Sequence, residues 1–183
     1  MTYNSYRDLF NEIILEPNKK APYDDADFFN YLVLNQKRED RWNKKGEINH
    51  VDFDKFKSLN TKMNWVLITE PWCGDAAHCC PFINKLVESN LNINLDVQLR
   101  DSDSEIDNYL TNGGKSIPIL IVRDENNKDL FTWGPRPKAA QEIHLANLKS
   151  DKSKEEQKIE LQKWYNSDKG ETVIKELFTL LKL

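Results

Sequence analysis

The sequence predicts an α/β domain with a mixed β-sheet, helices on both faces and further helices at both ends. Three patterns in the middle of the chain carry this prediction. An apolar run at 64–70 leads into a helix, a second apolar run lies at 93–99, and a paired run at 117–133 is typical of a hairpin. Two strands joined by a helix and followed by a hairpin place parallel and antiparallel neighbours in one sheet.

The N-terminal part predicts two helices. Within residues 1–45 apolar pairs recur at the three-to-four spacing of a buried helical face. Prolines and an Asp-Asp pair at 17–25 interrupt this pattern and separate the two helices. A short helix through Phe53 and Phe56 then precedes the first strand.

The central elements follow in order. The strand at 64–70 stops at Pro71, and a helix that carries three cysteines runs to about Ser89. A second strand follows at 93–99. Because the strands before and after this helix belong to one sheet, the helix packs on that sheet.

A further helix is expected after the second strand. Ser102 and Glu105 have the spacing of a capping box, and Gly113-Gly114 is a helix stop signal. Ile117 to Val122 and Lys128 to Trp133 then flank a polar turn, which predicts two hairpin strands.

After Gly134-Pro135-Arg136-Pro137 the chain is expected to be helical to its end, with a charged break at about 149–154. We interpret residues 1–183 as one domain, because this length buries a sufficient core without disulfides. Its parts are a helical N-terminal extension at 1–60, a core at 61–134 and a helical C-terminal extension at 135–183.

Composition excludes several classes of function. The formal net charge is -4 and basic residues do not gather on one expected face, so nucleic acid is not an expected partner. No apolar stretch reaches the ~20 residues that span a bilayer, and the start lacks the pattern of a signal peptide. We therefore expect no membrane contact and a soluble, cytoplasmic protein.

The candidate reactive residues are concentrated in the segment from Trp72 to Pro81, which reads Trp-Cys-Gly-Asp-Ala-Ala-His-Cys-Cys-Pro. Three cysteines within eight residues are too few for a secreted disulfide framework and indicate redox chemistry or metal binding. Cys73 stands where the helix is expected to start. Free amide hydrogens and the helix dipole favour a thiolate there, so Cys73 is the candidate catalytic nucleophile.

This part of the chain resembles thioredoxin over about 64–133. Trp72-Cys73-Gly74 matches the opening of the family's Trp-Cys-Gly-Pro-Cys site, and Pro81 lies where that family's helix has a kinking proline. Pro118 resembles the cis-proline that faces the nucleophile. The Trp-Cys-Gly-Asp variant, together with 133–137, resembles a bacterial subgroup of thioredoxin-family proteins.

The chain departs from that family at two chemical positions. Ala76 replaces the resolving cysteine, and Leu67 stands where thioredoxins have a buried acid. On a continuous helix Cys79 and Cys80 lie ~9 and ~10.5 Å along the axis from Cys73. A disulfide needs Cα atoms within about 7 Å, so neither closes on Cys73 unless the helix unwinds. They are either auxiliary, resolving thiols or packed core residues.

Charged and ionisable residues near Cys73 affect its expected reactivity. Asp75 and Glu70 are acids near Cys73 and oppose the lowering of its pKa. His78 is expected at the surface, where it can pair with Asp75. His78 and the cysteines are chemically suitable zinc ligands, but adjacent helical residues point about 100° apart, so we expect no metal.

The resemblance also implies a groove that receives an extended peptide beside Cys73. Its expected residues are Trp72, Gly74, Asp75, Ile117 and Pro118. Trp72 is either an exposed ring on the rim of this groove or a packed ring. Arg136 is expected as a solvated loop residue, with a contact to a partner as the alternative.

Two functions follow. The first is a thiol-disulfide oxidoreductase of monothiol or atypical type, without a cofactor, that uses Cys73 on a protein disulfide or with a low-molecular-weight thiol such as glutathione. The second is a redox-inactive module that holds a peptide in the groove.

Overall fold

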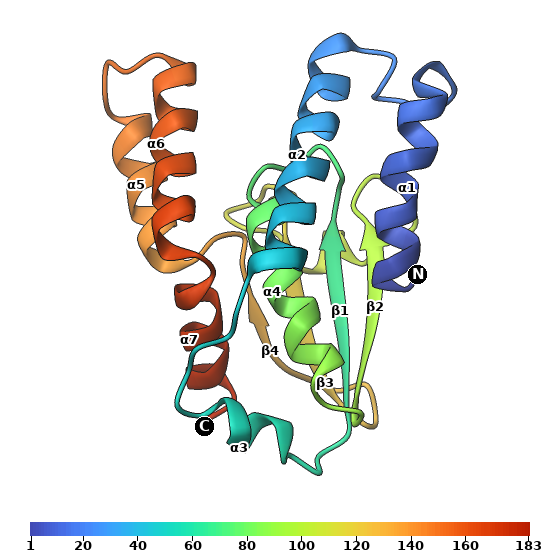
Figure 1. The fold of residues 1–183 in the computed structure, drawn as a ribbon, viewed down its shortest axis with the longest axis vertical. Helices are drawn as coiled ribbons and strands as arrows, with labels where there is room; N and C mark the ends of the chain where they lie inside the picture. The colour runs from blue at the N-terminus through green and yellow to red at the C-terminus, as the bar shows by residue number, and fades with distance from the viewer.

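The computed structural model describes residues 1–183, apart from the side chain of Lys19, and is built on one mixed sheet (Figure 1). Its strands are β1 (Met63–Thr69), β2 (Ile93–Leu99), β3 (Ile119–Asp124) and β4 (Asp129–Trp133). The strand order is β2-β1-β3-β4. β1 pairs parallel with β2 and antiparallel with β3, and β4 closes the predicted hairpin. The predicted α/β class is confirmed.

Helices precede, interrupt and follow the sheet. They are α1 (Tyr3–Leu15), α2 (Ala26–Lys45), α3 (Phe53–Lys57), α4 (Ala76–Glu88), α5 (Lys138–Leu148), α6 (Lys154–Asp168) and α7 (Glu171–Leu180). Local chemistry fixes several starts. The Asp25 carboxylate caps α2, and Ser153 with Glu156 forms a capping box at α6. Among the described residues, no helix combines the length and the apolar character that crossing a membrane requires.

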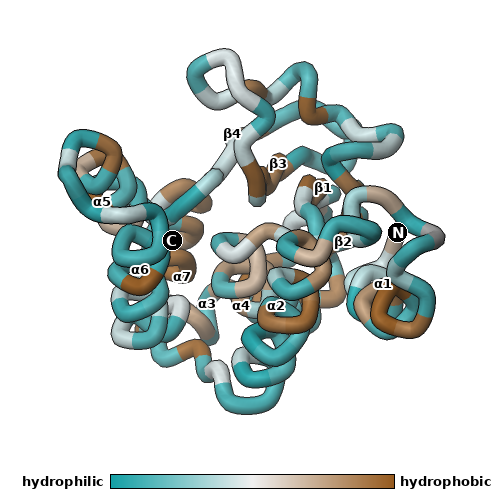
Figure 2. Tube along the Cα trace, turned by 90° about the horizontal axis from the view of Figure 1, so that it is seen from above, coloured by the Kyte–Doolittle hydropathy of each residue, from teal (hydrophilic) through white to brown (hydrophobic). Residues whose placement is uncertain are grey.

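The two faces of the sheet are covered differently. α4 packs on β2, and α2 packs on α4 as a further layer on the same side (Figure 2). The segment 100–116 contains only the short 3-10 helix η2 (Ile106–Asn108), whose Ile106 is 1% exposed. η2 is joined to the sheet by Arg123 of β3, which donates hydrogen bonds to Glu105 and to the hydroxyl of Tyr109.

The α-helix expected from Ser102 to Gly113-Gly114 is therefore wrong. A capping box needs the Glu105 carboxylate to turn back to the start of the helix. In the structure this carboxylate accepts hydrogen bonds from Arg123 and from the side-chain amide of Gln98. One partner from β2 and one from β3 thus outcompete the local cap.

The C-terminal helices complete the core. Residues 65–68 of β1 are buried, as expected for a central strand. α7 packs against α4 and buries Val173, Ile174, Leu177 and Phe178. The ring of Phe178 stacks on Phe56 of α3 with centroids 5.5 Å apart. The end of the chain is therefore packed against the same core as the sheet.

Gly134 lies where the chain leaves β4 and passes close to the start of β3. Its φ is 124°, and a Cβ built on it would lie 2.2 Å from the carbonyl oxygen of Pro118. No side chain fits at that distance, so glycine is required here for a close backbone approach. This approach holds the segment 134–137 against the loop that contains Pro118.

We predict that Gly134→Ala lowers the free energy of unfolding by about 3 kcal/mol, because it adds overpacking to an unfavourable φ. Gly113→Ala is the matched control. Gly113 also has a positive φ, 81°, but nothing lies within 4 Å of its built Cβ. The control should lose only about 1 kcal/mol in urea unfolding. Equal losses in the two variants would show that the approach to Pro118 is not constrained.

Candidate functional site

Cys73 lies in the turn between β1 and α4. Its N–H donates to the carbonyl of Glu70 at 3.0 Å, and its carbonyl accepts from the N–H of Ala77 at 3.2 Å. The thiol Sγ lies 3.4 Å from the carbonyl oxygen of Ile117, to which it donates. The Ile117–Pro118 peptide bond is cis. The structure thus places the candidate nucleophile directly against the loop before β3.

The thiol is protonated at neutral pH, in contrast to the thiolate that a helix N-terminus favours. Cys73 is only 7% exposed, and this burial raises its pKa to about 12, with a further increase from the charge of Asp75. The backbone N–H groups of Ala76 and Asp75 and the guanidinium of Arg136 act in the opposite direction. The increase in the Cys73 pKa caused by burial is larger than the decrease caused by these groups.

Cys79 and Cys80 lie in the core. Both are free thiols with no measurable exposure, and burial raises the pKa of each well above its usual value. The Sγ of Cys80 lies 3.9 Å from the hydroxyl oxygen of Thr69 on β1. In this arrangement they pack α4 against its neighbours and present no sulfur to a partner.

Asp75 is the most strongly connected side chain of the turn. Its carboxylate pairs with Arg136 at 2.7 Å and accepts a hydrogen bond from the hydroxyl of Tyr165 at 2.8 Å. The side chains of Asp75 and Arg136 are only 14% and 18% exposed. The expectation of a solvated Arg136 is therefore wrong, because the segment 134–137 folds onto the turn of Cys73.

His78 is buried, 4% exposed, and does not pair with Asp75 as expected. Its Nδ1 accepts from the indole N–H of Trp42 at 2.9 Å, so its Nε2 carries the hydrogen and donates to Gln162 at 3.1 Å. Its ring stacks on Tyr165 with centroids 4.5 Å apart. Burial lowers the pKa of His78 to about 3, so the ring is neutral. The surface prediction is wrong because α6 covers this part of α4.

Metal binding has no support in this geometry. Among the described side chains, no group of three or more His, Cys, Asp or Glu residues could hold a metal ion. Both ring nitrogens of His78 are used by Trp42 and Gln162, which leaves neither for a metal.

A cleft of about 620 Å³ opens beside the turn, between α2 and α6. It separates the five residues expected to bind a peptide into two groups. Trp72, Gly74 and Asp75 line the cleft. Ile117 and Pro118 are buried and do not belong to its lining. The accessible surface next to Cys73 is therefore bounded by the C-terminal helix α6 as well as by the turn.

Trp72 is half-buried on this surface. Its ring meets Phe28 of α2 edge-on at 5.7 Å, and the guanidinium of Arg100 lies 4.5 Å from its centroid. Its indole nitrogen is buried without a hydrogen-bond partner in the structure. Trp72 thus packs on α2 and also lines the cleft.

Sequence reasoning missed Arg38 of α2. Its Nη1 donates to the side-chain oxygen of Asn35 at 2.9 Å, and Asn35 donates in turn to the carbonyl of Pro71 at 2.9 Å. A Cβ built on Gly74 would lie 3.4 Å from this Nη1. Partial burial lowers the pKa of Arg38. Only the fold brings this cation to the turn, because nothing in its local sequence distinguishes it.

The site has the geometry of a thioredoxin-like domain. Cys73 precedes α4, Pro81 lies inside α4, and the cis Ile117–Pro118 bond lies directly before β3, with the Ile117 carbonyl against the thiol. A family model described as Thioredoxin matches residues 22–167, most of the chain. The chain therefore belongs to the thioredoxin family.

Two solved structures are similar to it. An HIV epitope scaffold aligns with a TM-score of 0.62 and 15% identity, and the alignment covers 85% of this chain and 91% of the scaffold. A protein of unknown function from Pseudomonas aeruginosa aligns with a TM-score of 0.61 and 15% identity, over 81% of this chain and 84% of that protein. At such identity the likeness shows the fold alone. No curated protein matches the chain.

The buried, neutral His78 predicts loss of stability in acid. Unfolded histidine binds a proton below about pH 6.5, whereas folded His78 does so only near pH 3, so folding is disfavoured as the pH falls between these values. Between pH 7.5 and 5.0 we expect wild type to lose about 2 kcal/mol more than His78→Gln in urea unfolding. An identical loss in both proteins would show that His78 is protonated in the folded state.

Proposed function

We propose that this chain is a thiol-redox protein in which Cys73 acts as a single nucleophile. The observation that carries the proposal is the position of its Sγ. The sulfur lies 3.4 Å from the Ile117 carbonyl, in a turn whose neighbouring residues Trp72 and Gly74 line an open cleft. A disulfide seated in that cleft lies beside the turn of Cys73, which at 7% exposed is less completely buried than Cys79 and Cys80.

The reaction has two steps. Cys73 loses its proton, and its sulfur attacks one sulfur of the partner's disulfide. The partner's S–S bond breaks, a mixed disulfide forms, and the leaving sulfur takes up the proton as a thiol. A low-molecular-weight thiol such as glutathione then attacks the mixed disulfide, which releases Cys73 as a thiol and leaves the incoming thiol joined to the partner. No net electrons are gained or lost by the chain.

The rate at which Cys73 attacks a disulfide depends on groups that raise and groups that lower its pKa. With a pKa of about 12, only a small fraction of Cys73 is thiolate at neutral pH. The N–H groups of Ala76 and Asp75 stabilise that thiolate once it forms, and Arg136 offsets the charge of Asp75. Attack is therefore slow at neutral pH and accelerates as the pH rises.

The Trp-Cys-Gly-Asp motif supports placing the chain in the bacterial subgroup of thioredoxin-family proteins that carries this variant. Three free cysteines support a reducing compartment, so we propose that the protein works in the bacterial cytoplasm. Its substrates are then a protein disulfide or a mixed disulfide with a small thiol.

The same protonated thiol favours a second function, a redox-inactive module that holds a partner in the cleft. A cysteine with a pKa of about 12, and with Ala76 in place of a second sulfur, is compatible with binding alone.

Mixed-disulfide formation distinguishes the two functions. We predict that incubation of the folded protein with glutathione disulfide at pH 8.5 adds one glutathione per chain, that peptide mapping places it on Cys73, and that Cys73→Ser abolishes it. Cys80→Ala, which removes a buried thiol, should retain the adduct. The rate should increase about tenfold per pH unit below the pKa.

An unmodified wild type, or equal labelling of Cys73→Ser, would contradict the redox proposal. A disulfide-reductase assay with reduced glutathione then tests turnover. Equal rates for wild type and Cys73→Ser would remove Cys73 from the mechanism.

A further inference from the structure

The cleft beside Cys73 is positively charged in a chain of net charge -4. Four cationic side chains line it against two carboxylates: Arg38, Arg136, Lys154 and Lys158 against Asp27 and Asp75. Asp75 and Arg136 neutralise each other as an ion pair. Among the described residues, no ion pair joins Arg38, Lys154 or Lys158 to a carboxylate. The free charge of the cleft is therefore cationic.

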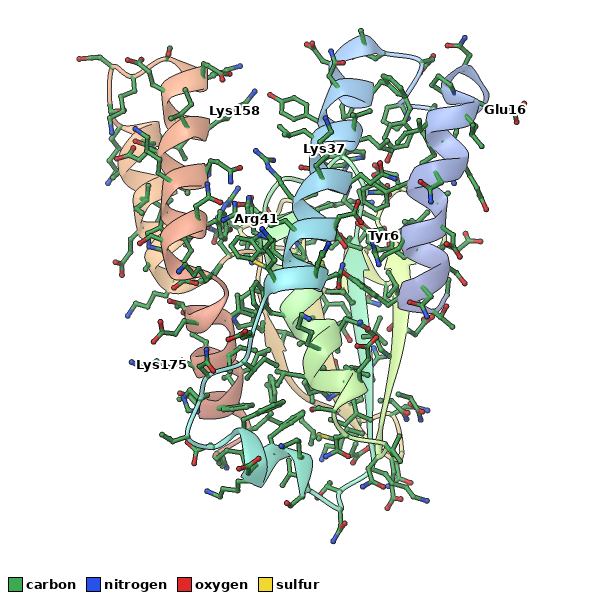
Figure 3. All side chains as sticks on the ribbon, viewed as in Figure 1. Tyr6, Glu16, Lys37, Arg41, Lys158 and Lys175 are labelled. Carbon is green, nitrogen blue, oxygen red and sulfur yellow. The ribbon has the colours of Figure 1, made fainter. Side chains whose placement is uncertain are left out.

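These cations stand on both walls. Arg38 of α2 lies against Gly74, next to the thiol turn. Lys158 of α6 reaches across toward α2 (Figure 3), where it donates to the hydroxyl of Tyr31 and lies 4.6 Å from the centroid of that ring. Phe28 and Trp72 provide apolar surface on the α2 side. An occupant of matching chemistry has apolar atoms in the middle and anionic groups toward both walls.

The cleft also has the size of a small-molecule site. Its volume of about 620 Å³ is within the range of pockets that enclose ligands of a few hundred daltons. A ligand of tripeptide size fits such a space.

The proposed chemistry of Cys73 requires an external thiol. Ala76 supplies no second sulfur, and Cys79 and Cys80 are enclosed in the core. The mixed disulfide on Cys73 must therefore be resolved by an external thiol. The cleft adjoins the turn that carries this cysteine, since Trp72 and Gly74 on either side of Cys73 line it.

We infer that the cleft binds a tripeptide-sized thiol that carries carboxylates, with these carboxylates paired to Arg38 and Lys158 and its sulfur directed to the turn of Cys73. The role of the bound thiol, which is to resolve the mixed disulfide on Cys73, rests on the proposed function. The binding itself depends only on the charge and shape of the cleft.

The test uses S-methylglutathione, a thioether that keeps both carboxylates but cannot exchange disulfides. Isothermal titration calorimetry on the full chain should show one site, weakened by added salt. Arg38→Gln and Lys158→Gln should each weaken binding about tenfold, because each removes a charge-assisted hydrogen bond. Lys175→Gln is the matched control. Lys175 is exposed on α7, away from the cleft (Figure 3), so affinity should not change.

A second ligand tests which groups are recognised. The diethyl ester of S-methylglutathione keeps the size of the ligand and removes its carboxylate charges, so it should bind at least about tenfold more weakly. Lys158 is exposed, and its replacement keeps the test valid even where Arg38→Gln fails to fold.

Any one of three results would overturn the inference. These are no binding of S-methylglutathione, equal affinity for its diethyl ester, and a loss of affinity in Lys175→Gln as large as in Arg38→Gln and Lys158→Gln. These outcomes are independent of mixed-disulfide formation on Cys73. Binding without exchange would support the cleft and refute the redox function, whereas exchange without binding would support the redox function and refute the cleft.

Discussion

The carboxylate of Asp75 joins three parts of the chain that are far apart in sequence. It pairs with Arg136 after the hairpin and accepts a hydrogen bond from Tyr165 of α6, while its own backbone opens α4. A charge that is only 14% exposed is costly unless it is paired and hydrogen-bonded. The turn that carries Cys73, the segment after β4 and the C-terminal helices are therefore positioned together.

This constraint explains how the helical additions come to form a cleft beside the turn of Cys73. Tyr165 ties α6 to the turn and stacks on His78, so α6 stands opposite α2 and the cleft forms between them. Burial in the same turn keeps the Cys73 thiol protonated. The architecture thus combines a cationic cleft with a thiol of which only a small fraction is ionised at neutral pH.

Sequence patterns predicted the strands, most helices and the position of the candidate nucleophile, because apolar periodicity and turn residues are local signals. These patterns gave wrong predictions where a residue far away in the sequence determines the conformation or the burial of a side chain. Glu105 pairs with Arg123 and so no helix forms after β2. His78 and Arg136 were expected in solvent, but Tyr165 and its helix cover the first, and the second folds onto Asp75. No local sequence pattern shows which distant helix will cover a given side chain in the folded protein.

Asp75 and Arg136 are expected to stabilise the fold as one buried unit. A double-mutant cycle of Asp75→Asn and Arg136→Gln, read as free energies of unfolding in urea, measures their coupling. Each single variant should lose about 3 kcal/mol, because it leaves the other charge buried and unpaired. The double variant should lose less than the sum of both by at least about 1 kcal/mol. Additivity within about 0.5 kcal/mol would contradict the account.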